Sequence, residues 1–439
     1  MKMILRKILL TAIAATIAAA SQAAEPTLAN RQAASNYFAY PYPEQQLPKL
    51  TPAPKGYEPF HMEHYGRHGS RWHIGEWVYQ SPVKLLLPAE RNGKLTPRGQ
   101  ELLEQMRRLE IASRGRSGEL TPLGAEQHRG IARRMTANFP EIFADGARVD
   151  AKSTDVVRCI LSMENELMEL MAFNPRLDIT SDASKSTVRY LNPDDAHADS
   201  IHNSIYPQAM AEVNAANIPD YEVFALQLVN DPKFIADSIN AKDLYNNLFL
   251  IVANAQSLTD RTAPFDLYTD RQIHDKWVRD NAEWFLRYGN TKWTGGTGPM
   301  RQRFLLRNWI ESADTCIMRQ QPSANLRFGH EVVLLPMAML MNLDGTGRQI
   351  DDMTRVADQW KNYEIFPMAS NIQMIFYRPQ GQTYTPDDVL VKVLLNEKEV
   401  TLPAKAVSGP YYRWTDIRRT YLDLLGPDGG RFPSPKPLK

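Results

Sequence analysis

One short segment combines the residue types that phosphoryl transfer requires. Arg67 and Arg71 flank His68 in the run Arg-His-Gly-Ser-Arg, and Gly66 and Gly69 permit close approach of the backbone to an anion. A neutral imidazole can act as a nucleophile near physiological pH, and a guanidinium group matches the geometry of phosphate. The segment could therefore supply a nucleophile and cations for the phosphoryl oxygens. Taken alone, it is equally typical of a solvated basic loop.

Three more candidate residues lie where an expected helix follows an expected strand. Arg158 falls in the first turns of one helix, and His330 and Glu331 open another. Because ligands of α/β sheets gather at the carboxyl ends of the strands, we expect these side chains to meet the 67–71 loop. The expected strand 57–65 precedes the 67–71 loop, 149–153 precedes Arg158, and 326–329 precedes His330.

Strands that alternate with helices predict an α/β fold, a three-layer sandwich with a mixed central sheet and an inserted, mostly helical cap. Six prolines between positions 41 and 59 disfavour regular structure there, so we expect an extended arm on the surface. The expected organisation is a signal peptide at 1–23, the arm at 24–56, core at 57–173, the helical cap at 174–315, core again at 316–425 and a tail at 426–439.

The first residues predict export. Lys2, Arg6 and Lys7 precede an apolar stretch at 8–20 and small residues up to position 23, which is the layout of a cleaved signal. We expect a periplasmic or secreted protein with no membrane anchor after cleavage. The formal charge of +1 provides no global field for nucleic acid. Cys159 and Cys316 cannot form a disulfide framework, and whether they pair stays open.

The motifs together resemble the histidine acid phosphatases, clade 2 of the histidine phosphatase superfamily. The resemblance rests on Arg-His-Gly-x-Arg, the segment from Gly118 to Gln127, Ser153-Thr154 with Arg158, and a late histidine beside an acid. Residues 284–289 and 391–402 are similar to the multiple inositol polyphosphate phosphatases, which are phytase-like members. One departure is His330-Glu331-Val332, where that branch usually has His-Ala-Glu.

The resemblance implies a phosphohistidine mechanism without a metal or another cofactor. His68 would attack phosphorus and Glu331 would donate the proton. The phosphoryl oxygens would be held by Arg67, Arg71, Arg158 and His330. Nearby arginines and the helix N-terminus favour ionised Glu331, which predicts an acidic activity optimum.

The expected function is hydrolysis of inositol polyphosphates or related small phosphomonoesters by an exported enzyme. Lys185 and Arg189 of the expected cap are candidate contacts for additional phosphates, although each alone is more typical of a solvated surface. A broad-specificity acid phosphatase acting on sugar phosphates and a non-catalytic phosphate-binding member are the alternatives.

A metal hydrolase is a weaker alternative. His64 and His68 have a spacing that suits metal ligands on a helix, but Gly66 between them argues against a helix. His330-Glu331 begins like a zinc-protease signature, yet Leu334 stands where the second histidine would be needed. A phosphohistidine mutase is disfavoured by export, and the sequence contains no P-loop motif.

Overall fold

The computed structural model describes residues 27–42, 45–186, 188–193, 195–258, 264–427 and 429–430. The expected signal peptide at 1–23 and most of the expected tail at 426–439 lie outside these residues. None of the helices in the described ranges combines the length and the apolar character needed to cross a membrane.

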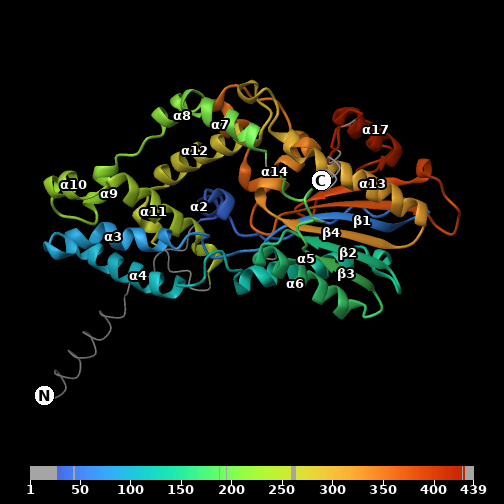
Figure 1. Ribbon diagram of the computed structural model, residues 1–439, viewed down its shortest axis with the longest axis horizontal. Coiled ribbons are helices and arrows are strands. Elements are labelled where there is room, and N and C mark those ends of the chain that lie inside the picture. Colours follow the sequence, from blue (N-terminus) through green and yellow to red (C-terminus); the bar gives the residue numbers. More distant parts are fainter. Residues whose placement is uncertain are drawn as a thin grey trace, which may run out of the picture.

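A mixed sheet, with helices packed on it, forms one half of the molecule (Figure 1). β3, β2, β4 and β1 are neighbours in that order and run parallel, whereas β5 to β8 pair antiparallel with their neighbours. Because β1, β2 and β4 are parallel, their carboxyl ends meet at one edge of the sheet. The strands are β1 (Tyr57–Arg67), β2 (Arg148–Ser153), β3 (Asp178–Asp182), β4 (Ser323–Gly329), β5 (Asn371–Pro379), β6 (Leu390–Leu395), β7 (Lys398–Val400) and β8 (Tyr412–Arg413).

Helices cover both faces of the sheet. The alternation of apolar residues along β5 provides the reason: Ile372 and Met374 join the core on one face, and Ile375 joins the core on the other. One face is covered by α5 (Pro122–Asn138) and α6 (Val157–Phe173), and the other by α13 (Arg303–Arg319), α14 (Glu331–Leu340) and α17 (Trp414–Leu425) (Figure 1). The expected α/β sandwich with a mixed sheet is confirmed.

Other helices lie beside the sheet, and most of them share a separate apolar core. The helices beside the sheet are α3 (Trp77–Arg91), α4 (Pro97–Ser113), α7 (Ala196–Ala209), α8 (Ala211–Ala216), α9 (Tyr221–Leu226), α10 (Pro232–Ser238), α11 (Ala241–Asn254) and α12 (Asp270–Tyr288). Of these, α7 and α8 pack on α12 and on the core between the sheet and α13, α14 and α17. Short helices α15 (Val356–Gln359) and α16 (Asn362–Ile365) follow later in the chain. Figure 1 shows this helical part beside the sheet.

The helical part differs from the expected insertion at 174–315. α3 and α4, from the first expected core segment, pack in its core. Conversely, β3 lies inside the expected insertion but pairs with β2, and α13 packs against β1. An amphipathic pattern reveals that a helix has an apolar face, but it does not say which of two neighbouring cores that face joins.

The segment before β1 also differs from the extended surface arm that the prolines predicted. It contains α2 (Leu28–Gln32), capped by the Thr27 side chain. Phe38, Tyr40 and Tyr42 are buried, so the segment forms part of the apolar packing. Proline forbids a long helix, but it does not prevent the aromatic residues between the prolines from packing into the fold.

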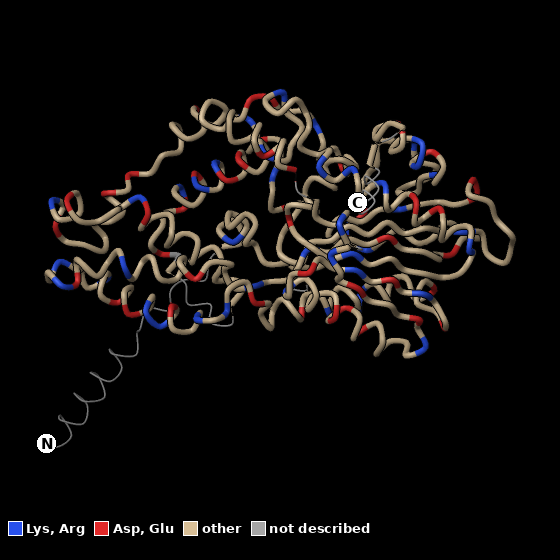
Figure 2. Tube along the Cα trace, viewed as in Figure 1, with Lys and Arg blue, Asp and Glu red and all other residues tan. Residues whose placement is uncertain are grey.

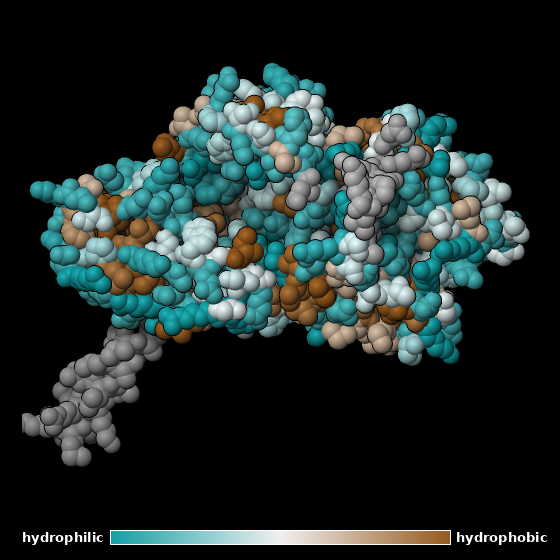
Figure 3. All heavy atoms as spheres, in the orientation of Figure 1, coloured by the Kyte–Doolittle hydropathy of each residue, from teal (hydrophilic) through white to brown (hydrophobic). Residues whose placement is uncertain are grey.

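Charges of both signs are interspersed over the molecule, and neither half carries mostly one sign (Figure 2). Apolar residues on the face drawn in Figure 3 form separate small groups within a largely hydrophilic surface. The mixture of charges agrees with the near-zero formal charge of the chain. Any anion site must therefore arise from a local group of cations.

We predict that the buried side chain of His64 on β1 makes the folded protein less stable in acid. The side chain is fully buried against Phe328, neither ring nitrogen has a hydrogen-bond partner, and burial lowers its pKa to about 3, with a further lowering from His128. Between pH 6.5 and 3 the unfolded chain therefore binds a proton that the native protein does not, so stability falls as the pH falls. At pH 4.5 this loss is roughly 2–3 kcal/mol.

Replacing His64 by leucine should remove most of that loss. We expect the difference in unfolding free energy between pH 7.5 and pH 4.5 to shrink by roughly 2–3 kcal/mol in His64→Leu, measured by urea unfolding. The control is His274→Leu, because the His274 side chain is 65% exposed. An unchanged pH dependence in His64→Leu would show that this histidine is not held neutral in the native state.

Candidate active site

The backbone of the 67–71 loop is fixed to three other parts of the chain. The N–H of His68 donates to the carbonyl of Gly329 at 2.9 Å, and the carbonyl of His68 accepts from the N–H of Ala369 at 3.0 Å. The N–H of Gly69 donates to Ser162 Oγ at 3.1 Å. The loop that follows β1 is therefore held by the end of β4, by the chain before β5 and by α6.

The segment around Thr121 braces the same loop. The N–H of Thr121 donates to the carbonyl of Ser70 at 2.9 Å, while the Gln127 amide accepts from the Ser70 N–H and donates to its hydroxyl. A Cβ atom on Gly69 would lie 2.4 Å from the carbonyl oxygen of Gly124, so the two backbones touch only because both residues are glycine. This second motif of the sequence thus supports the loop.

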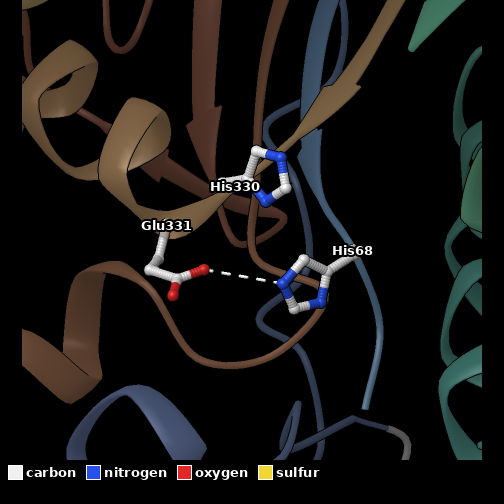
Figure 4. A group of neighbouring side chains, drawn as sticks. All are labelled: His68, His330 and Glu331. Carbon is white, nitrogen blue, oxygen red and sulfur yellow. Dashed lines mark ion pairs between the residues drawn. The ribbon is translucent and has the colours of Figure 1, made fainter. Parts of the chain in front are cut away.

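His68 presents an unprotonated nitrogen to the site. Its ring is buried, and Nδ1 lies 3.0 Å from the carbonyl of Gly69, which can only accept, so Nδ1 carries the proton. Nε2 keeps its lone pair and points toward Glu331, with 3.6 Å between Nε2 and Oε2 (Figure 4). Burial, assisted by Arg67, lowers the pKa of His68 well below its usual value despite the opposing effect of Glu331. The ring is therefore neutral, which is the form that a histidine nucleophile requires.

Arg67 is the best-anchored cation of the site. Its side chain is fully buried, and its two terminal nitrogens each donate at 2.7 Å, to the carbonyls of Phe366 and Asn36. Its Nε lies 3.1 Å from Glu331 Oε2. Burial lowers the pKa of Arg67 to about 10, which still leaves it charged at physiological pH. Asn36 belongs to the segment expected to be a surface arm, which instead helps to hold this arginine.

Arg71 and Arg158 add two further positive charges. Arg71 donates to the carbonyl of Trp72 at 3.0 Å, and its guanidinium lies 5.5 Å from the ring centre of Tyr37. Arg158 is partly buried on α6, its Nε has no hydrogen-bond partner, and burial lowers its pKa. Arg67, Arg71 and Arg158 all lower the pKa of His330, and Glu331 raises that of Arg158, so the three guanidinium groups lie near this pair of residues.

His330 lies at the N-cap of α14. Its backbone N–H donates to the Tyr65 hydroxyl at 2.9 Å, its Nε2 is 3.2 Å from Thr154 Oγ1, and the Cys159 sulfur is 3.8 Å from both ring nitrogens. The ring centre is 5.8 Å from that of His68. Burial lowers the pKa of His330 to about 4 although Glu331 opposes this change. A neutral His330 can donate one hydrogen bond to a phosphoryl oxygen.

Glu331 is ionised in the free protein. Its side chain is 13% exposed and lies beside Arg67 and His68. Burial alone would raise the pKa of Glu331, but the charges of Arg67 and Arg71 outweigh burial and hold it well below the usual value. The carboxylate therefore lies among the guanidinium groups, where an anion would bind.

Lys185 and Arg189 are not brought into this cluster. Lys185 Nζ lies 3.1 Å from Asp155, next to Thr154 in the chain, but the lysine side chain is 84% exposed. Arg189 is also exposed. Sequence reasoning missed Arg301, which lies over the Tyr288 ring at 5.3 Å and pairs with Asp199 at 3.0 Å.

A second overlooked cation is Arg287, the neighbour of Tyr288 at the end of α12. Burial raises the pKa of Tyr288, and Arg287, Arg301 and Glu331 all affect that pKa, so all three groups lie near this tyrosine. The sequence signal that could have indicated Arg287 was its position beside Tyr288 at the end of α12, a helix with several aromatic residues.

His68, His330 and Glu331 place one possible ligand atom each within 4.8 Å of one another, the single such group of His, Cys or acidic side chains in the described part of the chain. Three guanidinium groups around it repel a cation and favour an anion. His64 and His68 do not form a metal pair, because His64 packs beneath β1 in the apolar core next to Phe328. Cys159 and Cys316 are both free thiols.

The comparisons with known proteins agree with this geometry. Residues 67–396, about three quarters of the chain, match the family model of the histidine phosphatase superfamily, branch 2. Multiple inositol polyphosphate phosphatase 1 of Gallus gallus is 22% identical over 322 residues, which cover 70% of this chain and 69% of that protein.

Two solved structures share the fold. Multiple inositol polyphosphate phosphatase of Bifidobacterium longum, in complex with inositol hexasulfate, has a TM-score of 0.72 at 18% identity and covers 89% of this chain and 97% of that one. The phytase from D. castellii has a TM-score of 0.67 at 14% identity, covering 93% and 89%. The resemblance inferred from the motifs is confirmed: the chain belongs to branch 2 of the histidine phosphatase superfamily and is a phosphoric monoester hydrolase.

Proposed function

We propose that this enzyme is exported and hydrolyses inositol polyphosphates through a phosphohistidine at His68. The observation that carries the proposal is the lone pair on His68 Nε2, which faces Glu331 beside Arg67 and within the electrostatic influence of Arg71 and Arg158. With Glu331 as the neighbouring acid, these cations exceed the local negative charge by two. That excess suits a phosphate dianion.

The reaction proceeds in two displacements. His68 Nε2 attacks phosphorus, the ester P–O bond breaks, and the leaving alkoxide takes a proton from Glu331. Water then attacks the phosphohistidine, Glu331 takes the proton from that water, and the P–N bond breaks to release phosphate. The arginines and neutral His330 hold the phosphoryl oxygens in both steps, so the charge that develops on them is stabilised by fixed donors.

Substrate binding supplies the protonated carboxyl that this scheme needs. A phosphate dianion would displace the Glu331 carboxylate from Arg67 and add negative charge beside it. Both changes raise the pKa of Glu331 from its depressed value, so the carboxyl group takes up a proton in the complex at mildly acidic pH. The proposed enzyme is therefore most active below neutrality.

Three observations support an inositol polyphosphate as the substrate. The similar proteins of Gallus gallus and Bifidobacterium longum are named for this substrate class. The helical part contributes Arg287 and Arg301 near Tyr288, whose pKa Glu331 also affects, and Lys185 is exposed beside Asp155, the residue after Thr154. These side chains could contact phosphates other than the one that reacts. Lys185 and Arg189 remain candidate contacts on this basis.

The test is a substrate panel on protein isolated from the periplasm of a bacterial host, with the full chain expressed and a chelator present throughout. We expect the isolated protein to begin at Ala24, because the small residues before it suit a signal peptidase. kcat/KM should be at least about tenfold higher for inositol hexakisphosphate than for glucose 6-phosphate, which one further phosphate–arginine contact would explain. Equal values would favour a broad-specificity phosphatase, and no turnover would favour a binding protein.

A variant pair tests whether the helical part confers this preference. Arg287→Ala should lower kcat/KM for inositol hexakisphosphate about tenfold and leave that for p-nitrophenyl phosphate nearly unchanged. Arg271→Ala is the matched control, because this arginine lies on the same helix and is 86% exposed. Equal losses on both substrates in Arg287→Ala would argue against a contact with a second phosphate.

A further inference from the structure

The sheet has an unusual polar area under α13, well separated from the carboxyl edge that carries His68. Side chains two apart on a strand share a face, and the pairing register aligns three strands. One row across the sheet contains Glu63, Asn325 and Asp150, and a neighbouring row contains His61, Ser323 and Arg148. The intervening residues, on the opposite face, are apolar and form part of the core under α5 and α6: Met62, Val149, Ala151, Ala324 and Leu326.

A pocket of about 500 Å³ opens between this polar face and α13. α13 contributes Asn308, Ser312, Cys316 and Arg319 to its wall, and β2 and β4 contribute its floor. The pocket extends to residues 321 and 322, just before β4 begins. It lies toward the amino ends of these strands, whereas the site described above lies beyond their carboxyl ends. The two sites are distinct.

The lining of the pocket carries a net charge of +2. The basic residues are Arg148, Lys152, Arg319 and Arg327, and the acidic ones are Asp150 and Asp178. Asp150 is already paired with two of the cations, at 2.8 Å from Arg327 and 3.2 Å from Lys152. Arg148 and Arg319 form no ion pair with any residue in the described ranges. Both are exposed, so they lie at the mouth of the pocket.

Polar atoms in the wall lack partners. Arg327 is only 2% exposed, and its Nε makes no hydrogen bond. The Asn308 amide on α13 also has an unpaired buried atom, Oδ1, but this oxygen can only accept a hydrogen bond and so suits water and not an anion. Buried polar groups are nearly always hydrogen-bonded, so such a group at the wall of an open pocket indicates a position for a ligand or ordered water. The neighbouring Glu63 accepts at Oε1 from Ser312 and Asn325 and lies 3.2 Å from His61 Nε2, whereas its buried Oε2 has no hydrogen-bond partner.

We propose that this pocket binds a small oxyanion, either a phosphate ester or a carboxylate, above Arg327 and between Arg148 and Arg319. The guanidinium of Arg327, held by Asp150, supplies a fixed charge at the floor, and the two exposed arginines complete a cationic frame. The proposal does not depend on the chemistry assigned to His68.

Cys316 offers a local reporter of occupancy. It lines the pocket, and the only other thiol in the chain, Cys159, is fully buried beside His330. Burial raises the pKa of the Cys316 thiol, but its neighbour His61 outweighs burial and leaves that pKa below the usual value. Burial raises the pKa of Cys159 to about 12. Cys316 should therefore react with iodoacetamide faster than Cys159 does, as measured by mass spectrometry of the two peptides.

The experiment titrates inorganic phosphate and, separately, citrate against the alkylation rate of Cys316, at constant ionic strength maintained with chloride. We expect saturable protection by at least one of the two anions, and the more protective one identifies the ligand chemistry. In the Arg148→Ala/Arg319→Ala variant the concentration needed for half protection should rise about tenfold or more. Arg355→Ala, an exposed arginine outside the pocket, should behave as the unchanged protein does.

Crystals soaked in tungstate, a phosphate analogue, give an independent result if Cys316 proves slow to react. Tungstate next to Arg327 supports the proposal. A filled His68 site with an empty pocket, or protection that is insensitive to the double arginine variant, overturns it. Turnover of p-nitrophenyl phosphate by the double variant should be unchanged, which separates this pocket from the proposed phosphatase site.

Discussion

Replacing His68 by alanine is expected to lower kcat for inositol hexakisphosphate by about 10⁴-fold or more. Among the described residues the His68 imidazole is the group best placed to attack phosphorus, because its Nδ1–H is held by the Gly69 carbonyl and its Nε2 faces Glu331 beside Arg67. Binding should persist, since Arg67, Arg71 and Arg158 remain. Initial rates and phosphate binding by calorimetry measure the two effects separately.

Two controls make this result specific. His197→Ala replaces an exposed histidine and should leave the rate unchanged. The melting temperature of His68→Ala should stay near that of the unchanged protein, so that the loss of rate reports chemistry. A variant that keeps more than a tenth of the activity would mean that another group attacks phosphorus.

The second large effect is expected for Glu331→Gln. An alkoxide leaving group needs a proton and nitrophenolate does not, so loss of the general acid should depend on the substrate. We expect kcat/KM to fall about 10²–10³-fold for glycerol phosphate and to change little for p-nitrophenyl phosphate. Glu364→Gln, at an exposed position, is the control. Equal losses on the two substrates would exclude Glu331 as the proton donor.

The pH dependence has a defined sign in this account. His68 has a pKa well below its usual value, so its neutral form persists into acidic solution and activity should not fall until the pH is low. Glu331 must be protonated, so activity with an alkyl phosphate should decline as the pH rises through its pKa in the complex. In Glu331→Gln this alkaline decline should disappear. A profile of the unchanged enzyme that peaks well above neutrality would contradict the assignment.

The proximity of the main site residues could be predicted from the sequence because their motifs lie at the ends of strands. The His68 loop is continuous in the chain, and its residue types alone suggested anion chemistry. Arg158 and His330 follow β2 and β4, and parallel order brings the carboxyl ends of these strands beside that of β1. The expectation that these positions meet needed no knowledge of side-chain packing.

Contacts between distant residues could not be predicted in this way. Tyr65 was assigned to a strand, and nothing in its neighbourhood indicated that its hydroxyl would hold the backbone of His330. Asn36 anchors Arg67 through a backbone carbonyl, which has no sequence signature at all. The contact of Gly69 with Gly124 likewise appears only when two separate turns are placed together.

The predicted boundary of the helical part differs from the observed one for a related reason. α3 and α4 follow the His68 loop directly and were expected in the sheet core, yet they pack with α11 and its neighbours. Helical periodicity identifies an apolar face, and which core receives that face depends on the whole topology. The polar face of β2 and β4 was missed because a two-residue alternation predicts a strand without saying that a helix will cover its polar side.

The central claim is a covalent bond between phosphorus and His68. Glu331→Gln with p-nitrophenyl phosphate tests it most directly, because this variant lacks the base for the second step while its first step needs no acid. We expect a burst of nitrophenolate and, after an alkaline quench, a phosphoryl group on the peptide that contains His68. A burst with the phosphoryl group on another residue, or steady turnover with no labelled protein, would contradict the account.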